Sequence, residues 1–176
     1  EAMGKCNEIR KVLPEFRLSI NISQVQASKS DVIQDISAEM KRTGLPLEAL
    51  IVELTESDLL EQNINEKHFL TELRRMGISL ALDDFGTGYS SISLLNSLPF
   101  ANIKLDKSLI DTIDDVKGLK SIKHIIALSK DLGMTITAEG VEHESQKNSL
   151  MDLKCDNIQG FFYSPPMPEK EFVKLL

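Results

Sequence analysis

Residues 78–91 read Ile-Ser-Leu-Ala-Leu-Asp-Asp-Phe-Gly-Thr-Gly-Tyr-Ser-Ser and carry a strand pattern directly into a pair of carboxylates. Such a pair at the end of a buried strand is unfavourable, because burying even one unpaired charge is costly and a like charge beside it raises the cost. A bound cation removes this penalty, and Gly86 and Gly88 allow a tight loop afterwards. The alternative is an Asp-Asp helix cap, since Asp is common where helices begin.

The composition is that of a single globular domain spanning residues 1–176. The chain is 41% hydrophobic with a mean hydropathy of -0.12, and 176 residues are enough for one core. No stretch approaches the roughly 18 apolar residues of a membrane span, and no signal peptide is visible. Cys6 and Cys155 form no CxxC pair and are typical of reduced thiols, so we expect a cytoplasmic domain.

The net charge of the chain and the positions of its histidines argue against two kinds of ligand, nucleic acids and zinc. A net charge of -7 argues against binding of DNA or RNA through a basic patch. An acidic protein can still bind a phosphate ligand when divalent metals lie between the two. His68, His124 and His143 fall within helical patterns rather than at strand ends, so we expect surface histidines and no His-based zinc site.

Strand-like and helix-like segments alternate along the chain. Apolar residues at helical spacing predict helices around residues 32–40, 69–76 and 119–132, each followed by a glycine. Repeated βα units of this kind predict a parallel sheet covered by helices. The six predicted strands cover residues 17–23, 50–55, 78–83, 101–105, 134–139 and 156–159.

The predicted strands are apolar on one face only. In the first strand Leu18 and Ile20 share one face, while Ser19 and Asn21 share the other. The third and fifth strands alternate in the same way. A doubly wound sheet, covered by helices on both sides, would be apolar on both faces. One apolar and one polar face favours an α/β barrel of the (β/α)8 type, with the polar face toward the lumen.

Each predicted strand ends with a polar residue in the lumen-facing phase. The carboxyl ends of the strands are where (β/α)8 barrels carry their active sites. Strands also end in polar residues simply because loops begin there, but that explanation accounts for one or two residues and not for six in matched phase. The six residues are Asn21, Glu53, Asp83, Lys104, Glu139 and Gln159.

These residue types predict metal-assisted chemistry on a phosphate ester. Carboxylate and amide oxygens suit Mg²⁺ or Mn²⁺, and a shared carboxylate would hold two ions. Lys104 is suited to hold the nucleophilic water or the developing negative charge, although a salt bridge to a neighbouring carboxylate is also expected of it. Glu139 is suited to accept the water's proton or to bind the second metal. The oxygen donors are Asn21, Glu53, Asp83 and Asp84.

Six segments that carry the predicted site residues follow one another along the chain. They are Ser-Ile-Asn-Ile-Ser at 19–23, Glu-Leu-Thr-Glu-Ser at 53–57, residues 83–91, Lys-Leu-Asp at 104–106, Ala-Glu-Gly-Val-Glu at 138–142 and Gln-Gly-Phe at 159–161. In this order they resemble the EAL-domain cyclic-di-GMP phosphodiesterases of bacteria. The resemblance spans nearly the whole chain and implies a modified (β/α)8 TIM-type barrel. It also implies hydrolysis of cyclic-di-GMP to linear pGpG with Mg²⁺ or Mn²⁺.

The resemblance implies a role for each matching residue. Asn21, Glu53 and Asp83 match metal ligands, and Asp84 matches a ligand of the second metal. The remaining matches are Lys104 at the catalytic water, Glu139 as general base or second-metal ligand, Glu142 and Gln159 near the substrate guanine or metal site, and Glu56 as anchor of the 83–91 loop. In the family that loop couples dimerisation to metal binding, which implies a homodimer.

One family motif is out of place. The family is named after a Glu-Ala-Leu motif on an early strand, several tens of residues before the position of Asn21. This chain has Glu48-Ala49-Leu50 after Asn21, in a predicted turn following Pro46, so we do not assign Glu48 to the metal. We therefore expect an N-terminally truncated domain that lacks the first two barrel strands. Residues 1–176 alone are expected to be inactive, whereas the parent protein is expected to be an enzyme.

Two other functions compete with hydrolysis. A non-catalytic cyclic-di-GMP receptor or effector would keep the fold, but such proteins usually lose acidic ligands, and here each testable ligand is present. An unrelated metal-dependent barrel enzyme, such as an aldolase, would not show the same order of motifs. In the parent protein we also expect regulatory domains, such as a sensor or a GGDEF domain.

Overall fold

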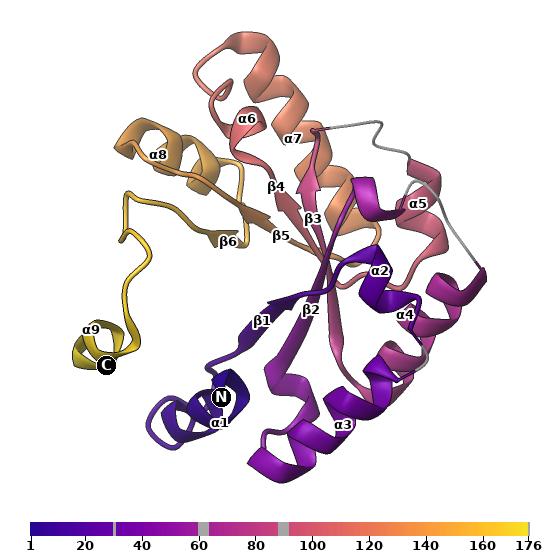
Figure 1. The fold of residues 1–176 in the computed structure, drawn as a ribbon. Helices are drawn as coiled ribbons and strands as arrows, with labels where there is room; N and C mark the ends of the chain where they lie inside the picture. Colours follow the sequence, from indigo (N-terminus) through magenta and orange to yellow (C-terminus); the bar gives the residue numbers. More distant parts are fainter. Residues whose placement is uncertain (30, 60–63, 88–91, 176) are drawn as a thin grey trace. The chain divides into compact units, whose positions relative to one another are not determined.

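The computed structural model describes residues 1–29, 31–59, 64–87 and 92–175 (Figure 1). Within this part of the chain, six strands form one sheet in the order β1-β2-β3-β4-β5-β6. The β1–β2, β3–β4, β4–β5 and β5–β6 pairs are parallel. A doubly wound sheet reverses its strand order at a switch point, whereas a (β/α)8 barrel adds each strand beside the preceding one. The α/β barrel-type fold is therefore confirmed, with six described strands against the eight of a complete barrel.

The chain divides into two compact units, and the first comprises Glu1–Leu54, Asp58–Leu80 and Met167–Leu176. Helix α1 contacts α3 and β1, and α2 contacts α4. The elements of this unit are α1 (Ala2–Ile9), β1 (Leu18–Asn21), α2 (Gln24–Ala27), α3 (Val32–Thr43), η1 (Leu47–Ala49), most of β2 (Leu50–Thr55), most of η2 (Ser57–Leu59), α4 (Ile64–Met76), α9 (Glu169–Phe172) and η3 (Val173–Leu175).

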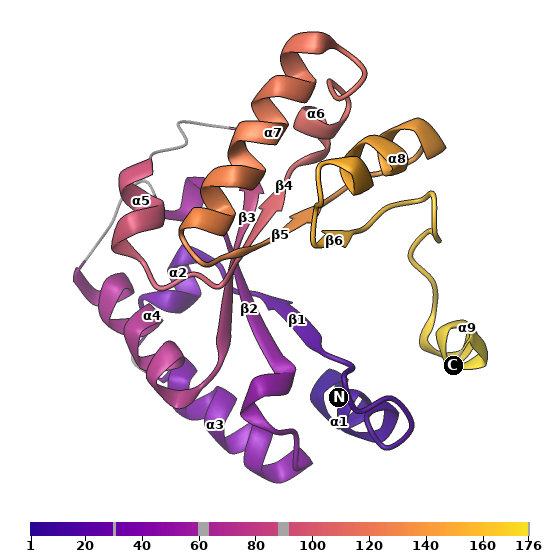
Figure 2. The same cartoon turned by 180° about the vertical axis from the view of Figure 1, so that it is seen from behind.

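The second unit comprises Thr55–Ser57 and Ala81–Pro166 and carries the rest of the sheet. Helix α7 contacts α6 and β5, and it lies across one face of the strands (Figure 2). Its elements are most of β3 (Ser79–Phe85), α5 (Ile92–Ser97), β4 (Asn102–Leu105), α6 (Lys107–Ile110), α7 (Val116–Asp131), β5 (Thr135–Ala138), α8 (Glu144–Asp152) and β6 (Asn157–Ile158).

The alternation predicted for the strands appears in the burial of β1 and β5, whereas β2, β3 and β4 contain runs of consecutive buried residues. In β5, Ile136 and Ala138 are fully buried, while Thr135 is exposed and Thr137 is half-buried. In β4, Ile103 is fully buried on the apolar face. Because successive side chains of a strand point to opposite faces, the residues that alternate with these buried ones lie on the other face of the sheet, where polar groups can be placed.

The ends of α3 and α7 follow the predicted glycines, whereas the start of α7 follows a capping residue that was not predicted. Helix α3 ends at Gly44, which adopts the left-handed conformation with φ of 70°. Helix α7 starts at Val116, because the Asp115 carboxylate accepts hydrogen bonds from the first backbone N–H groups. The predicted end of α7 is confirmed, since Leu132 is the C-cap and Gly133 follows it with a left-handed φ of 73°. The predicted start near residue 119 was wrong, because the helix begins at Val116, and Leu119 is exposed instead of lining the buried face.

The predicted surface histidines are confirmed. All three are exposed, although His143 is the N-cap of α8 and does not lie inside a helix. Cys6 and Cys155 are free thiols, and burial raises the pKa of both. None of the described helices has the length and apolar character that crossing a membrane requires.

Truncation of Ile103 tests the packing between β4 and its covering helices. Because its side chain is fully buried, Ile103→Ala is expected to lower the free energy of unfolding by about 2–5 kcal/mol. The matched control Ile103→Val keeps most of the volume and is expected to cost only about 0.5–1.5 kcal/mol. The measurement is denaturant unfolding of both variants, and equal losses would contradict the assignment of Ile103 to the core.

Candidate functional site

The two adjacent carboxylates lie on an irregular part of β3. The strand was predicted to end at Asp83 but continues to Phe85, and its pairing with β4 shifts register between Leu82 and Phe85. Within this stretch Asp84 has a positive φ of 55°. Successive side chains of a regular strand point to opposite faces, whereas an irregularity of this kind redirects one of them.

The redirected side chain joins a cluster of three carboxylates. Oxygen atoms of Asp83, Asp84 and Glu139 all lie within 4.8 Å of one another. The Asp83 Oδ1 atom accepts a hydrogen bond of 3.0 Å from the backbone N–H of Asp84, which fixes the pair. Three hard oxygen donors at this separation are suited to a divalent cation such as Mg²⁺, Mn²⁺ or Ca²⁺ and unsuited to soft metals.

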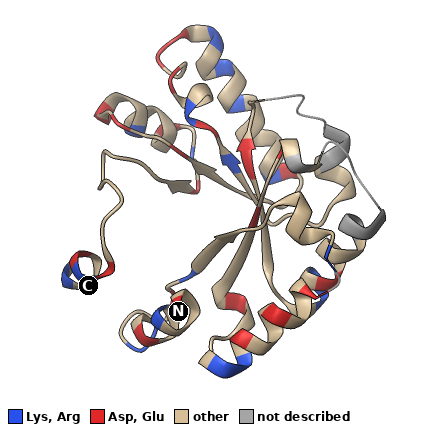
Figure 3. Ribbon diagram, in the orientation of Figure 1, with Lys and Arg blue, Asp and Glu red and all other residues tan. Residues whose placement is uncertain are grey.

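Lys104 places a positive charge within this cluster. Its Nζ atom lies 3.1 Å from Asp83 Oδ2 and 2.9 Å from Glu139 Oε1. The neighbouring strands β3 and β4 accordingly carry acidic and basic stretches side by side (Figure 3). The Lys104 side chain is only 10% exposed, so these contacts are weakly screened by water. The salt bridge predicted for Lys104 is therefore present, and both of its partners belong to the carboxylate cluster.

Glu139 begins a turn that the sheet holds from both sides. Its backbone N–H donates to Leu105 O on β4 at 3.0 Å. Two residues later, the N–H of Val141 donates to Gln159 O at 3.1 Å, beyond the end of β6. The turn needs Gly140, which has a φ of 66°. The backbone of the site is therefore fixed by hydrogen bonds.

Glu142 and Gln159 lie at the exposed rim of this turn. Both side chains are exposed, and the Glu142 carboxylate pairs with Lys107 at 3.2 Å. The sequence patterns did not predict this partner, because Lys107 and Glu142 are distant in the chain and share no motif. Gln159 is tied to the sheet by its backbone N–H, which donates to Ala138 O at 2.8 Å.

Glu56 holds the start of the loop that follows β3. Its side chain is buried, and Oε2 accepts a hydrogen bond of 3.2 Å from the backbone N–H of Gly86. The backbone N–H of Glu56 donates to Asp83 O at 3.0 Å. This contact is the one expected of a loop anchor, although residues 88–91 of the predicted 83–91 loop lie outside the described residues.

Asn21 and Glu53 lie in the first unit, at the same level of two paired strands. They are register partners across β1 and β2, and the N–H of Ile22 donates to Glu53 O at 3.0 Å. Asn21 is exposed, whereas Glu53 is buried. Glu48 lies in the short helix η1 and is exposed, in agreement with its exclusion from the strand-end residues.

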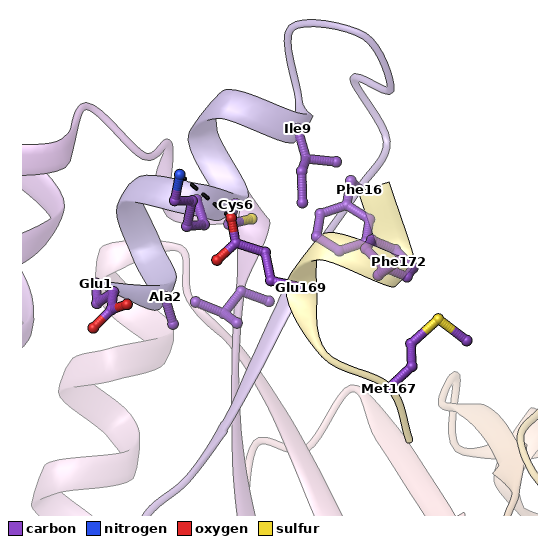
Figure 4. Close-up of a pocket in the computed structure, with 10 residues that line it drawn as sticks. Glu1, Ala2, Cys6, Ile9, Phe16, Met167, Glu169 and Phe172 are labelled. Atoms are coloured by element: carbon purple, nitrogen blue, oxygen red, sulfur yellow. Dashed lines mark ion pairs between the residues drawn. The ribbon is translucent and has the colours of Figure 1, made fainter. Parts of the chain in front are cut away.

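A separate cavity of about 490 Å³ lies in the first unit, between α1, β1 and the C-terminal segment (Figure 4). Ile9, Phe16 and Phe172 contribute its apolar lining, and Lys5 pairs with Glu169 at 3.3 Å. The rings of Phe16 and Phe172 lie 5.6 Å apart between centroids. No predicted site residue lines this cavity.

Comparison with known proteins identifies the family of the chain. The family model of the EAL domain covers residues 2–166. The chain belongs to the EAL domain family. Among solved structures, the EAL domain of Mycobacterium smegmatis DcpA is similar with a TM-score of 0.92 and 34% identity, over 99% of this chain and 80% of that one. A manganese and cyclic-di-GMP complex of Klebsiella pneumoniae BlrP1 has a TM-score of 0.87 and 28% identity, over 94% of this chain and 42% of that one.

Curated relatives of this EAL domain are longer proteins. The signalling protein YkoW of Bacillus subtilis is 38% identical over 92% of this chain, which spans 20% of that relative. The cyclic di-GMP phosphodiesterase RocR of Pseudomonas aeruginosa is 34% identical over 90% of this chain, which spans 41% of it. The chain thus spans about a fifth to two fifths of the length of these relatives.

Metal titration tests the carboxylate cluster directly. We expect the intact protein to bind Mn²⁺, and Asp83→Asn or Glu139→Gln to weaken that binding by about tenfold or more, because each variant loses a charged ligand. Isothermal calorimetry with Mn²⁺ alone measures this without any substrate. The matched control is Asp152→Asn, which removes an exposed carboxylate on α8. Equal affinities for all four proteins would contradict the site.

Proposed function

We propose that the intact protein that carries this chain hydrolyses cyclic-di-GMP to linear pGpG, with Mg²⁺ or Mn²⁺ as cofactor. The observation that carries the proposal is the Lys104 ammonium, held between Asp83 and Glu139 inside a cluster of three carboxylates. The family and the similarity to RocR and to the BlrP1 complex support the same chemistry.

The residues proposed to hold the metal are all oxygen donors. Asp83, Asp84 and Glu139 are close enough to share an ion, and Asn21 and Glu53 complete the proposed set, which we assign to two ions. When bound, divalent cations neutralise charge on the phosphodiester and lower the pKa of a water molecule. The family comparison supports a divalent ion here, since BlrP1 was solved with manganese and with calcium.

Lys104 and Glu139 are the residues proposed to act on the reacting atoms. A water oxygen bonds to phosphorus, the bond from phosphorus to one ribose oxygen breaks, and that oxygen takes up a proton and leaves as a hydroxyl group, which opens the cyclic dinucleotide. Glu139 takes the proton of the attacking water, as a general base. Lys104 donates hydrogen bonds to that water and to the negative charge that develops on phosphate in the transition state. Their contact of 2.9 Å keeps both groups at the same point of the sheet.

The substrate and the partners follow from this assignment. Glu142 and Gln159, at the exposed rim, are proposed to contact cyclic-di-GMP. Glu56 is proposed to anchor the loop that couples the site to a homodimer, supported by its contact with Gly86. Because the curated relatives are several times longer, we also propose regulatory domains in the intact protein. Since the proposed substrate is a bacterial second messenger, the proposal includes a cytosolic location for the domain.

A receptor that binds cyclic-di-GMP without hydrolysing it is the second candidate function. Its support is the same fold, since the EAL family match does not depend on turnover. The two functions differ in one result, because the receptor binds the dinucleotide and releases no pGpG. Chromatographic detection of pGpG with the intact protein and Mn²⁺ separates them.

Removal of one ligand charge tests the assigned metal site in the enzyme. Glu53→Gln and Asp83→Asn are each expected to abolish hydrolysis of cyclic-di-GMP while leaving the fold intact, because a hard cation loses a charged ligand. Chelation by EDTA is expected to abolish activity in the same way. The checks are pGpG release and circular dichroism. Full activity in either variant, or in EDTA, is the outcome that contradicts the proposal.

Substitution of Lys104 tests its role in the transition state. Lys104→Ala is expected to lower kcat by roughly 100-fold while KM changes little, because its charge acts on the developing phosphate charge. The comparison requires kcat and KM measured side by side, with unfolding monitored because the side chain is buried. A raised KM at unchanged kcat would instead make Lys104 a substrate-binding residue.

A further inference from the structure

Lys107 lies at the rim of the site and makes contacts that the assigned roles do not use. It opens the short helix α6, and its Nζ atom lies 2.9 Å from Asp111 Oδ1 and 3.2 Å from Glu142 Oε1. The first contact is one helical turn away on its own segment, and the second reaches the turn after β5. One lysine therefore links α6 to a residue proposed to contact substrate.

The stem of Lys107 is packed and does not extend freely into solvent. A Cβ atom placed on Gly140 would lie 2.5 Å from the Lys107 Cβ atom and 2.6 Å from its Cγ atom. The turn that begins at Glu139 therefore fits against this side chain only because residue 140 is glycine. Long side chains lose rotamer freedom on forming an ion pair, and a stem that is already packed has less to lose.

The helix that carries Lys107 is itself tied to the candidate site. The N–H of Asp106 donates to Phe85 O at 3.3 Å, at the end of the irregular stretch of β3. The Asp106 carboxylate caps α6 by accepting from Ser108 N at 2.9 Å. Burial is the largest single effect and raises the pKa of Asp106, but hydrogen bonds from Ser108 and Lys107 and the charge of Lys107 together keep that pKa below its usual value. The first turn of α6 is thus fixed relative to β3.

The target of the contact is equally well fixed. The backbone N–H of Glu142 donates to Gln146 Oε1 at 2.9 Å, and Gln146 is buried. The preceding residue, Val141, is fully buried and is hydrogen-bonded to Gln159. The backbone of Glu142 is therefore held in place, and its carboxylate orientation depends on what the side chain contacts. Lys107 supplies that contact through Glu142 Oε1.

We propose that Lys107 is a positioning residue that orients the Glu142 carboxylate toward cyclic-di-GMP. The inference rests on the proposed function, and it adds a residue outside the strand-end groups. Asp111 holds the ammonium from one side, so that Lys107 meets Glu142 in one geometry. The hydrogen bond to Asp111 raises the pKa of Lys107 above its usual value, and the contact with Glu142 raises it further. Desolvation lowers this pKa by a smaller amount than the Asp111 hydrogen bond raises it. The lysine is therefore charged at neutral pH.

The test is a double-substitution cycle in the intact protein. Lys107→Met keeps the packed stem and removes the charge, and it is expected to raise KM for cyclic-di-GMP about two- to fivefold, the range of an exposed ion pair, with kcat unchanged. Lys107→Arg is expected to restore KM. In a Glu142→Gln background, Lys107→Met is expected to have no further effect, because the partner charge is already gone.

A matched control separates this role from a general loss of positive charge. Lys120 is exposed on α7, and Lys120→Met changes the net charge of the protein by the same amount. It is expected to leave KM unchanged. Two outcomes would overturn the proposal: an effect of Lys107→Met that is equal with and without the Glu142→Gln substitution, or equal effects of the two lysine variants.

The outcome also distinguishes this inference from the proposed function. If the unsubstituted protein binds cyclic-di-GMP but releases no pGpG, hydrolysis is wrong, and the same cycle is read as dissociation constants by calorimetry. Coupling between Lys107 and Glu142 in those dissociation constants then supports the positioning role, and its absence contradicts the role. If the unsubstituted protein neither hydrolyses nor binds cyclic-di-GMP, both proposals are wrong. An active unsubstituted protein without coupling between Lys107 and Glu142 removes only the positioning role.

Discussion

The contact of one ammonium group with two carboxylates is the interaction on which the candidate site depends. Asp83, Asp84 and Glu139 bring three negative charges within 4.8 Å, which alone would be strongly repulsive. Lys104 Nζ lies 3.1 Å or less from two of them. In a buried setting such a contact offsets the loss of hydration only when the geometry is good. The structure provides that geometry by placing Asp83 on β3, Lys104 on the adjacent β4, and Glu139 directly after β5.

The strand geometry explains why the cluster contains Asp84 at all. Regular β-structure would turn Asp83 and Asp84 to opposite faces, and the register shift in β3 prevents this. A residue with φ of 55° is uncommon outside glycine, although Asp tolerates the left-handed region better than most. Glu56 supports the same stretch through hydrogen bonds with Asp83 O and Gly86 N. Local strain at β3 is thus compensated by the adjoining strand.

Sequence patterns predicted the strands well because their signal is local. All six predicted strands are present, and the local pattern of apolar and polar residues that indicated them needed no knowledge of partners. The predicted strands were too long at their ends, since Glu139 and Gln159 lie directly after β5 and β6. Alternation could not predict the position of Asp84, since the irregularity in β3 depends on pairing with β4. It also misassigned Leu119 to a buried face, because helical spacing does not reveal which residues tertiary contacts cover. The link from Lys107 to Glu142 joins distant segments and leaves no periodic signal.

Lys104 and Lys107 differ in solvent exposure, and this difference determines how strongly the charge of each lysine acts on its neighbours. Lys104 is 10% exposed, so water screens its charge only weakly, and its loss removes the positive charge beside Asp83 and Glu139. Lys107 is 43% exposed, so water and salt weaken its ion pairs. Such pairs contribute little energy but can still orient a side chain. A strongly coupled charge suits the reacting phosphate, where charge changes during the reaction. A weakly coupled charge suits the rim, where a carboxylate must be oriented and yet release its ligand. The acidic chain, with a net charge of -7, thus carries one buried and one partly exposed lysine in the same unit, and the proposed function assigns the first to the phosphate and the second to the orientation of Glu142.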